Sequence, residues 1–277
     1  MAAPTASGRP ELETGLTADQ GAIPSGVTSR GPIKLTLCDA PQRLFLLAAE
    51  ELYRSVAGHL EGLCTAYALY VEERFDHVGS GPNDYSIKNL AAEYVRRIER
   101  EQPHGPYHVA GISFGGLVAY EVAQQLRARG KAVHFIGLID ALVPRAGWRG
   151  MRYTLKRFQS LSLTDVSAVL NTYRKGLKEV PGRDEGLTPE QNVREAAHLS
   201  AARTYAREIK PWPGTVTVIA SGERLAESPV RGSDCCWSCY TPKLDVHIVQ
   251  AAHDKLLHEP GASEVASVIA QGMLRPS

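Results

Sequence analysis

The chain has almost no excess charge of either sign and no long apolar run. Its 31 Lys and Arg residues balance 30 Asp and Glu residues, and the formal net charge over 277 residues is +1. A charge this small gives no reason to expect binding to nucleic acid or to an anionic membrane. Residues 1–12 lack the basic start and apolar core of a secretory signal. The longest apolar run early in the chain, residues 44–49, is too short to span a bilayer.

Cysteine is scarce and unevenly placed. There are five cysteines, an odd number, and Cys235, Cys236 and Cys239 lie within one short segment. A secreted protein of this size is expected to carry paired cysteines spread along the chain, so we expect a reducing, cytoplasmic location. A zinc site needs four well-placed ligands, and no second ligand pair accompanies these cysteines. We therefore interpret them as free structural thiols and expect no metal.

The first 41 residues differ in character from the rest of the chain. They are rich in Gly, Ala, Ser, Thr and Pro and show no apolar periodicity, which is typical of a flexible leader or linker. In residues 42–277, short apolar runs alternate with amphipathic segments. This alternation predicts an α/β fold with a mostly parallel sheet covered by helices on both faces. Strands are expected at 44–47, 65–71, 107–110, 133–139, 215–220 and 244–249, and helices at 51–60, 87–98, 117–129 and 262–273.

A long segment, residues 141–213, separates two of the expected strands. Its helical patterns cover residues 155–170 and 191–209, and it includes a basic run at 145–157 that we interpret as a solvated surface. A connection of about seventy residues is too long for an ordinary loop and is often functional. We expect it to form a helical lid.

One short motif predicts covalent chemistry. Residues 111–115 read Gly-Ile-Ser-Phe-Gly, between an apolar strand and an amphipathic helix. In a nucleophile elbow this turn strains the serine backbone, and glycines on either side remove side chains that would clash. The following helix directs its free amides toward an anion formed nearby. The alternative is a glycine-rich turn of the nucleotide-binding kind, but the flanking strand and helix favour Ser113 as a nucleophile.

A serine hydroxyl needs a base to remove its proton and an acid to orient that base. Enzymes with a nucleophile elbow supply them in the chain order serine, acid, histidine. Asp140 follows the strand at 133–139 and has the expected place for the acid, although an isolated Asp more often caps a loop.

Histidines near the end of the chain supply candidates for the base. His253 follows the last strand by a few residues, and His258 is an alternative in the same loop. We favour His253 as the base and expect His258 to serve at the surface. A structural role is expected for three histidines on or beside strands, namely His108, His134 and His247.

Several stretches together resemble type I thioesterase domains, the terminal release modules of polyketide synthases and nonribosomal peptide synthetases. The most specific is residues 105–123, which read Gly-Pro-Tyr-His-Val-Ala-Gly-Ile-Ser-Phe-Gly-Gly-Leu-Val-Ala-Tyr-Glu-Val-Ala. Three further stretches add to the likeness, namely residues 85–92, residues 205–218, and Trp237 followed by residues 246–253. The resemblance runs from about residue 44 to residue 273 and implies an α/β-hydrolase fold.

The resemblance also implies a substrate and a mechanism. An acyl, polyketide or peptidyl chain is expected to arrive as a thioester on the phosphopantetheine of a carrier protein, with no further cofactor. Ser113 would take the acyl group, His253 would act first as base and then as acid, and Asp140 would hold the His253 tautomer. Water or a nucleophile within the chain would then release the product. The sequence leaves open hydrolysis or macrocyclisation, a homodimer, and whether the domain belongs to a larger synthase.

The expected oxyanion hole departs from the family pattern. The backbone amide of Phe114 is the first expected donor. For the second donor, the family has a His-Pro or glycine-rich turn after its first strand, whereas this chain has Ala-Ala-Glu-Glu at residues 48–51. The amide of Glu50 is the candidate by position, although a carboxylate beside an oxyanion is unfavourable unless it points away. Two alternatives remain: a free-standing esterase or lipase-like hydrolase that uses the same triad on oxygen esters, and an impaired thioesterase-like domain that binds partners, which this turn alone supports.

Overall fold

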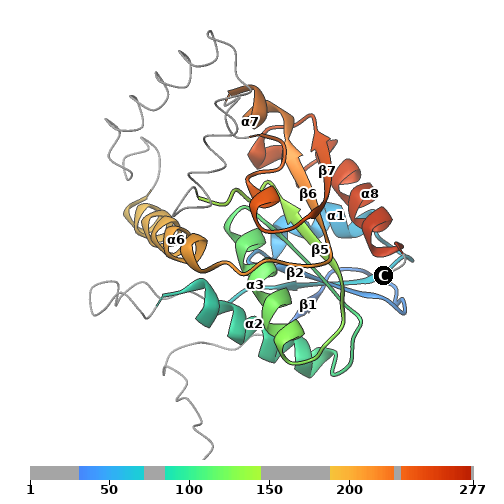
Figure 1. The fold of residues 1–277 in the computed structure, drawn as a ribbon. Helices are drawn as coiled ribbons and strands as arrows, with labels where there is room; N and C mark the ends of the chain where they lie inside the picture. The colour runs from blue at the N-terminus through green and yellow to red at the C-terminus, as the bar shows by residue number, and fades with distance from the viewer. Residues whose placement is uncertain (1–30, 72–84, 145–187, 228–231, 276–277) are drawn as a thin grey trace, which may run out of the picture.

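The computed structural model describes residues 31–71, 85–144, 188–227 and 232–275 (Figure 1). Seven strands form one sheet in the order β1-β3-β2-β4-β5-β6-β7. Strand β1 pairs antiparallel with β3, and the other neighbours pair in parallel. The strands are β1 (Ile33–Lys34), β2 (Arg43–Leu47), β3 (Thr65–Leu69), β4 (Tyr107–Ile112), β5 (Val133–Ile139), β6 (Thr215–Ser221) and β7 (Lys243–Val249).

Helices cover both faces of this sheet, as the sequence predicts. Helices α2 (Ile87–Glu101), α3 (Phe114–Ala128) and α6 (Pro189–Glu208) share one apolar core with the first face. Helices α1 (Arg54–Gly58) and α8 (Gly261–Met273) share a second core with the other face (Figure 1). Because both faces are covered, the central strands are continuous apolar runs rather than alternating patterns.

Two parts of the fold differ from the expected boundaries. The sheet begins before residue 42, because β1 pairs with β3 and the buried Thr36 hydroxyl accepts a hydrogen bond from the Ala66 amide at 3.1 Å. A two-residue strand is too short to produce a readable alternation. The helix expected at 51–60 is instead a 3-10 turn, η1 (Glu51–Tyr53), followed by the short helix α1.

The remaining expected strands and helices in the described ranges lie within a few residues of their observed bounds. Helix α6 begins with a capping box, in which Thr188 and Gln191 exchange side-chain and backbone hydrogen bonds. The helix expected at 155–170 and the basic run at 145–157 lie outside the described residues. In the part of the chain that is described, no helix has both the length and the apolarity needed to cross a membrane.

The second half of α6 is held firmly against α3. Its buried residues recur at helical spacing, at Ala197, Ala201, Ala202, Tyr205 and Ala206. The Tyr205 hydroxyl donates to a carboxyl oxygen of Glu121 on α3 at 2.9 Å. Burial, with the nearby Glu121 carboxyl adding to it, raises the pKa of Tyr205 well above its usual value, so the phenol stays protonated and can donate.

Loss of that hydroxyl should loosen the contact between α6 and α3. We expect Tyr205→Phe to lower the free energy of unfolding by about 1.5–3 kcal/mol, because a buried carboxyl oxygen loses its donor. Tyr240→Phe is the matched control: its hydroxyl donates to the neutral Ala206 carbonyl at 3.2 Å, and its loss should cost about 1 kcal/mol. Urea unfolding followed by circular dichroism measures both. An equal or smaller loss for Tyr205→Phe would contradict this role of the Glu121 contact.

Candidate active site

The three predicted catalytic positions lie at the carboxyl edge of the sheet. Ser113 directly follows β4, Asp140 directly follows β5, and His253 begins a 3-10 turn, η3 (His253–Lys255), after β7. Because parallel strands end at the same edge, the fold brings segments that are far apart in sequence to one place.

Ser113 has the strained backbone of an elbow. Its φ and ψ are 53° and −122°, in the positive-φ region that non-glycine residues seldom adopt, and α3 begins at the next residue. The Ser113 amide donates to the Ile139 carbonyl of β5 at 2.8 Å. A Cβ on Gly111 would lie 2.2 Å from the Gly115 carbonyl oxygen, and one on Gly115 would lie 2.7 Å from that of Leu47. The two motif glycines are therefore required by close backbone contacts.

Asp140 and His253 are in direct contact. Asp140 Oδ2 lies 2.5 Å from His253 Nδ1, and Asp140 Oδ1 accepts from the Ser221 amide at 3.3 Å. Burial of Asp140, which is 5% exposed, opposes its ionisation. Hydrogen bonds from His253 and Arg224 outweigh this burial and hold the pKa of Asp140 below its usual value. The group facing His253 is thus a carboxylate that can accept the Nδ1 proton.

A third charged group, Arg224, joins this pair and was not identified from the sequence. It lies in α7 (Gly222–Glu227), directly after β6. One guanidinium nitrogen is 2.8 Å from Asp140 Oδ2 and 3.0 Å from His253 Nδ1. The only signal in the sequence that could have pointed to Arg224 is its position just after β6, a strand that ends at the same sheet edge as β4 and β5. A six-residue helix has too little periodicity to be read with confidence from pattern alone.

Ser113 and His253 are both partly exposed at this edge. Within the described ranges, no hydrogen bond joins the Ser113 hydroxyl to His253. In structures without substrate, such contacts are often long and shorten only when substrate binds. His258, the alternative base, is exposed, and in the same ranges its imidazole forms no hydrogen bond with Asp140. The geometry therefore favours His253 over His258.

The three histidines expected to be structural differ in exposure, since His108 is buried, His247 half-buried and His134 exposed. His108 is buried, its Nδ1 lies 2.9 Å from the Arg43 carbonyl oxygen, and burial lowers its pKa. His247 pairs with Asp245 at 2.7 Å. His134 packs edge-on against the His108 ring, with ring centres 6.2 Å apart. All three lie on β4, β5 or β7, before the strand ends that carry the candidate site.

The turn after β2, where the second oxyanion donor is expected, lies against the elbow. A Cβ on Gly115 would be 3.0 Å from Ala48 Cβ. The Ala48 amide already donates to the Leu69 carbonyl at 2.9 Å, so it is not available to an oxyanion. The next amides along the turn belong to Ala49 and Glu50, and Glu50 precedes η1 with φ −108° and ψ −73°. Glu50 remains the predicted second donor, and Phe114, the first residue of α3, remains the predicted first donor.

A buried tyrosine links the two sides of this expected oxyanion hole. Tyr53 is fully buried, and its hydroxyl donates to the Leu47 carbonyl at 3.1 Å and accepts from the Ile112 amide at 2.9 Å. Leu47 ends β2 and Ile112 ends β4 next to Ser113. One phenol therefore fixes the spacing between the turn and the elbow.

Helix α6 reaches the site through ring stacking. The His198 ring on α6 lies parallel to the Phe114 ring, with centres 4.0 Å apart and planes 3° apart. The Tyr85 ring stacks 6.3 Å from Phe114 and 5.9 Å from His198. The residue that follows Ser113 is therefore in contact with the 141–213 insertion.

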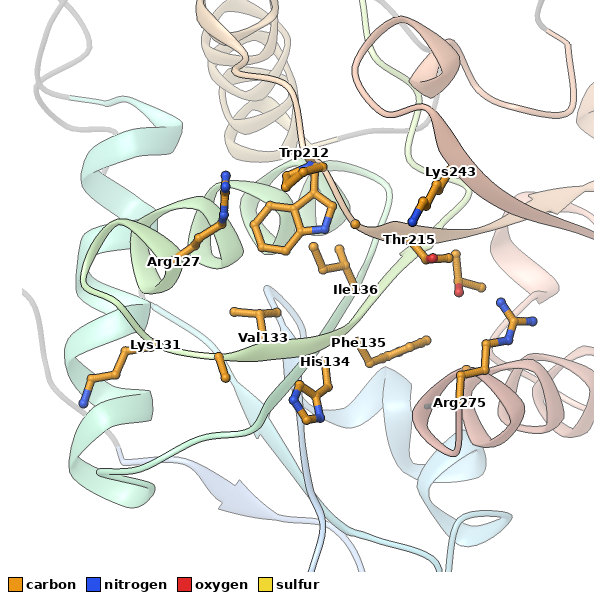
Figure 2. A pocket seen from close by; sticks show the side chains of 15 residues that line it. Arg127, Lys131, Val133, His134, Phe135, Ile136, Trp212, Thr215, Lys243 and Arg275 are labelled. Atoms are coloured by element: carbon orange, nitrogen blue, oxygen red, sulfur yellow. The ribbon is translucent and has the colours of Figure 1, made fainter. Parts of the chain in front are cut away.

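A hollow of about 390 Å³ lies at the opposite edge of the sheet, where β5, β6 and β7 begin. Figure 2 shows its labelled side chains around Trp212 and Phe135. Its basic side chains are already engaged in part: Arg127 lies 5.5 Å over the Trp212 ring, and Arg275 pairs with Asp245 at 2.7 Å. The hollow is separated from Ser113 by the length of the strands and is not the candidate site.

Three of the five cysteines, Cys64, Cys235 and Cys236, are buried, and Cys38 is exposed. Among the side chains that the structure describes, no three His, Cys, Asp or Glu residues are grouped so as to hold a metal ion.

Removal of the Tyr53 hydroxyl should affect both stability and the elbow. We expect Tyr53→Phe to cost about 1–3 kcal/mol in unfolding free energy, because the Ile112 amide and Leu47 carbonyl lose a buried partner. It should also slow reaction of Ser113 with a fluorophosphonate. Tyr107→Phe is the control, since its hydroxyl donates to the Gln102 carbonyl at the far end of β4. Equal labelling rates in both variants would contradict a positioning role for Tyr53.

The Asp140 contacts should make stability depend on pH. Because the pKa of Asp140 in the folded state lies below its usual 3.8, its contacts stabilise the fold above about pH 4 and are lost as pH falls through the lowered value. Asp140→Asn should cost about 1–2 kcal/mol near pH 7, and the difference from wild type should shrink below about pH 4. Asparagine tolerates the positive φ of 43° at this position.

Denaturant unfolding at several pH values measures this difference. Asp39→Asn is the control, because Asp39 pairs with Lys34 but is 83% exposed, and such pairs contribute little. A destabilisation by Asp140→Asn that persists unchanged at low pH would show that the effect is not due to the Asp140 charge.

The chain is similar to segments of much longer proteins. It is 28% identical over 195 residues to enterobactin synthase component F of Escherichia coli. This match covers 68% of this chain and 14% of that protein. It is 42% identical over 79 residues to an "Inactive atromentin synthetase" of Paxillus involutus, covering 27% of this chain and 8% of that protein. The chain thus spans less than a sixth of the length of these relatives.

Solved structures agree on the fold. The NocB thioesterase domain from the nocardicin cluster superposes with a TM-score of 0.58 at 24% identity, covering 85% of this chain and 95% of that one. A second structure of that domain is a covalent complex with a fluorophosphonate nocardicin G analog. The family model for thioesterase domains matches residues 45–271. Because this match takes in the elbow, the Asp140–His253 pair and strands β3 to β7, the chain belongs to the thioesterase domain family.

Proposed function

We propose that this domain releases an acyl, polyketide or peptidyl chain from the phosphopantetheine of a carrier protein through an acyl-Ser113 intermediate. The observation that carries the proposal is the Asp140–His253 contact of 2.5 Å at the same sheet edge as the strained Ser113 turn. The similarity to enterobactin synthase component F supports a carrier-bound thioester as the substrate class.

In the proposed reaction, Asp140, His253 and Ser113 act in a definite order. Asp140 accepts the Nδ1 proton of His253, which leaves Nε2 as the free base. Nε2 removes the Ser113 hydroxyl proton as the oxygen attacks the thioester carbonyl, and the Phe114 and Glu50 amides stabilise the oxyanion. The protonated His253 then gives its proton to the leaving pantetheine thiol. Attack by water, or by a hydroxyl or amine of the chain, regenerates Ser113 by the reverse sequence.

Replacement of the nucleophile gives the direct test. Ser113→Ala should reduce release from an acyl-pantetheine thioester by at least about 10³-fold while leaving the unfolding transition intact. Mass spectrometry of the intact wild-type protein should detect the acyl adduct, and the variant should not form it. Turnover that persists in the variant would overturn the assignment. Ser238→Ala is a control, since Ser238 is exposed and its hydroxyl donates to the Asp234 carboxylate.

Two alternatives predict different outcomes of the same assays. A free esterase would cleave matched oxygen esters as fast as thioesters and would gain nothing from a carrier protein. The alternative of a catalytically impaired binding domain rests on the Ala-Ala-Glu-Glu turn and on the similarity to a relative named as inactive. Such a domain would resist labelling of Ser113 by a fluorophosphonate, whereas the proposed enzyme reacts with it.

A further inference from the structure

The hollow at the opposite edge of the sheet is lined by basic side chains. Figure 2 shows Arg127 and Lys131 at one side of it and Lys243 and Arg275 at the other. None of the described Asp or Glu residues lines it, and the acid beside it, Asp245, is already paired with Arg275. Among the described residues, no carboxylate pairs with Arg127 or with the Lys243 ammonium. The hollow therefore favours a negatively charged ligand.

Three hydrogen-bond donors lie together where β6 and β7 begin. Thr215 and Lys243 are register partners on these parallel strands, so their side chains lie side by side on one face. In Figure 2 the Lys243 ammonium points toward Thr215, and the indole nitrogen of Trp212 is on the side of its ring that faces them. A Cβ on Gly214 would lie 2.8 Å from Trp212 Nε1, so any other residue there would cover or displace the indole N–H.

Two of the donors that line the hollow are almost completely buried. Trp212 is 5% exposed, and Thr217, which is on the same face of β6 as Thr215, is 2% exposed. Within the described ranges, neither Trp212 Nε1 nor the Thr217 hydroxyl forms a hydrogen bond with a protein group. Buried polar groups nearly always have a partner, so two such donors in one hollow indicate a ligand that supplies the acceptors.

The lining also indicates the chemical class of that ligand. A phosphate ester carries a charge of about −1.5 to −2 and three acceptor oxygens, and it therefore matches this set of donors better than a carboxylate with two oxygens. The hollow of about 390 Å³ has the size of pockets that hold small organic molecules. Phe135 and Ile136 give it an apolar floor (Figure 2). The ligand is thus expected to combine a phosphate group with an apolar organic part.

We propose that this hollow binds a small organic phosphate. Its phosphate group accepts hydrogen bonds from Lys243, Trp212 and the two threonines, and its organic part packs on the apolar floor. Arg127 lies 5.5 Å over the Trp212 ring, where it adds positive charge beside the indole. Because the length of the strands separates this site from Ser113, the proposal does not depend on the proposed function.

Isothermal titration calorimetry of the full chain with phenyl phosphate tests this site. Phenyl phosphate should bind about tenfold more tightly than inorganic phosphate, because its ring buries apolar surface. Lys243→Met should weaken the binding of phenyl phosphate by about tenfold, because a charge-assisted hydrogen bond is lost. Lys34→Met is the matched control: Lys34 pairs with Asp39 on β1, at the other end of the sheet, and its replacement should leave the affinity unchanged.

Two further variants test the buried donors. Trp212→Phe and Thr217→Val each remove one neutral donor and should each weaken binding by about threefold. Thr217→Val should leave the thermal unfolding of the ligand-free protein unchanged, because the hydroxyl has no protein acceptor among the described residues. Ser113→Ala should bind phenyl phosphate like the wild type, so the failure of this site and the failure of the proposed function are separate results.

The same titrations contain the results that would overturn the proposal. These are no binding of phenyl phosphate, an affinity unchanged in both Lys243→Met and Trp212→Phe, or equal affinities for phenyl phosphate and inorganic phosphate. Binding of hexaglutamate without binding of phenyl phosphate would also overturn it and would identify the hollow as a surface for an acidic protein segment. Circular dichroism of each variant checks that the chain remains folded.

Discussion

The whole site depends on one backbone contact between β4 and α3. The chain must turn from strand to helix at Ser113 with a positive φ, and this turn closes only because the backbones at Gly111 and Gly115 come into direct contact. The same closeness packs the helix against the end of β2, so the turn at Ala48 lies beside the elbow that contains Ser113. Any side chain larger than hydrogen at these glycines would separate the strand, the helix and the turn together.

Much of this arrangement could be predicted from sequence because its causes are local. The motif at residues 111–115 predicts the turn between strand and helix, and continuous apolar runs identify the strands that are buried on both faces. Parallel strands then place Asp140 and His253 at the same edge as Ser113 without knowledge of any contact. The family likeness extended this to the substrate class, and the match over residues 45–271 confirms the family.

The features that could not be predicted depend on contacts between residues that are far apart in the sequence. Tyr53 lies in an expected helix, and only the folded chain brings its hydroxyl between Leu47 and Ile112. Arg224 resembles any surface arginine until α7 places it against Asp140. The strand β1 was not predicted because two residues are too few to show the alternation of apolar and polar side chains that identifies a strand. In each case the deciding partner lies on another element, so no local pattern records it.

Phe114 has two tasks that cannot be altered independently. Its amide is the expected oxyanion donor, and its ring stacks on His198 of the segment expected to shape the substrate chamber. A change in α6 that alters this stack would therefore also act on the backbone that carries the proposed oxyanion donor. If the domain acts as proposed, a redesign of α6 for another acyl chain is expected to lower the rate unless the stack between Phe114 and His198 is kept.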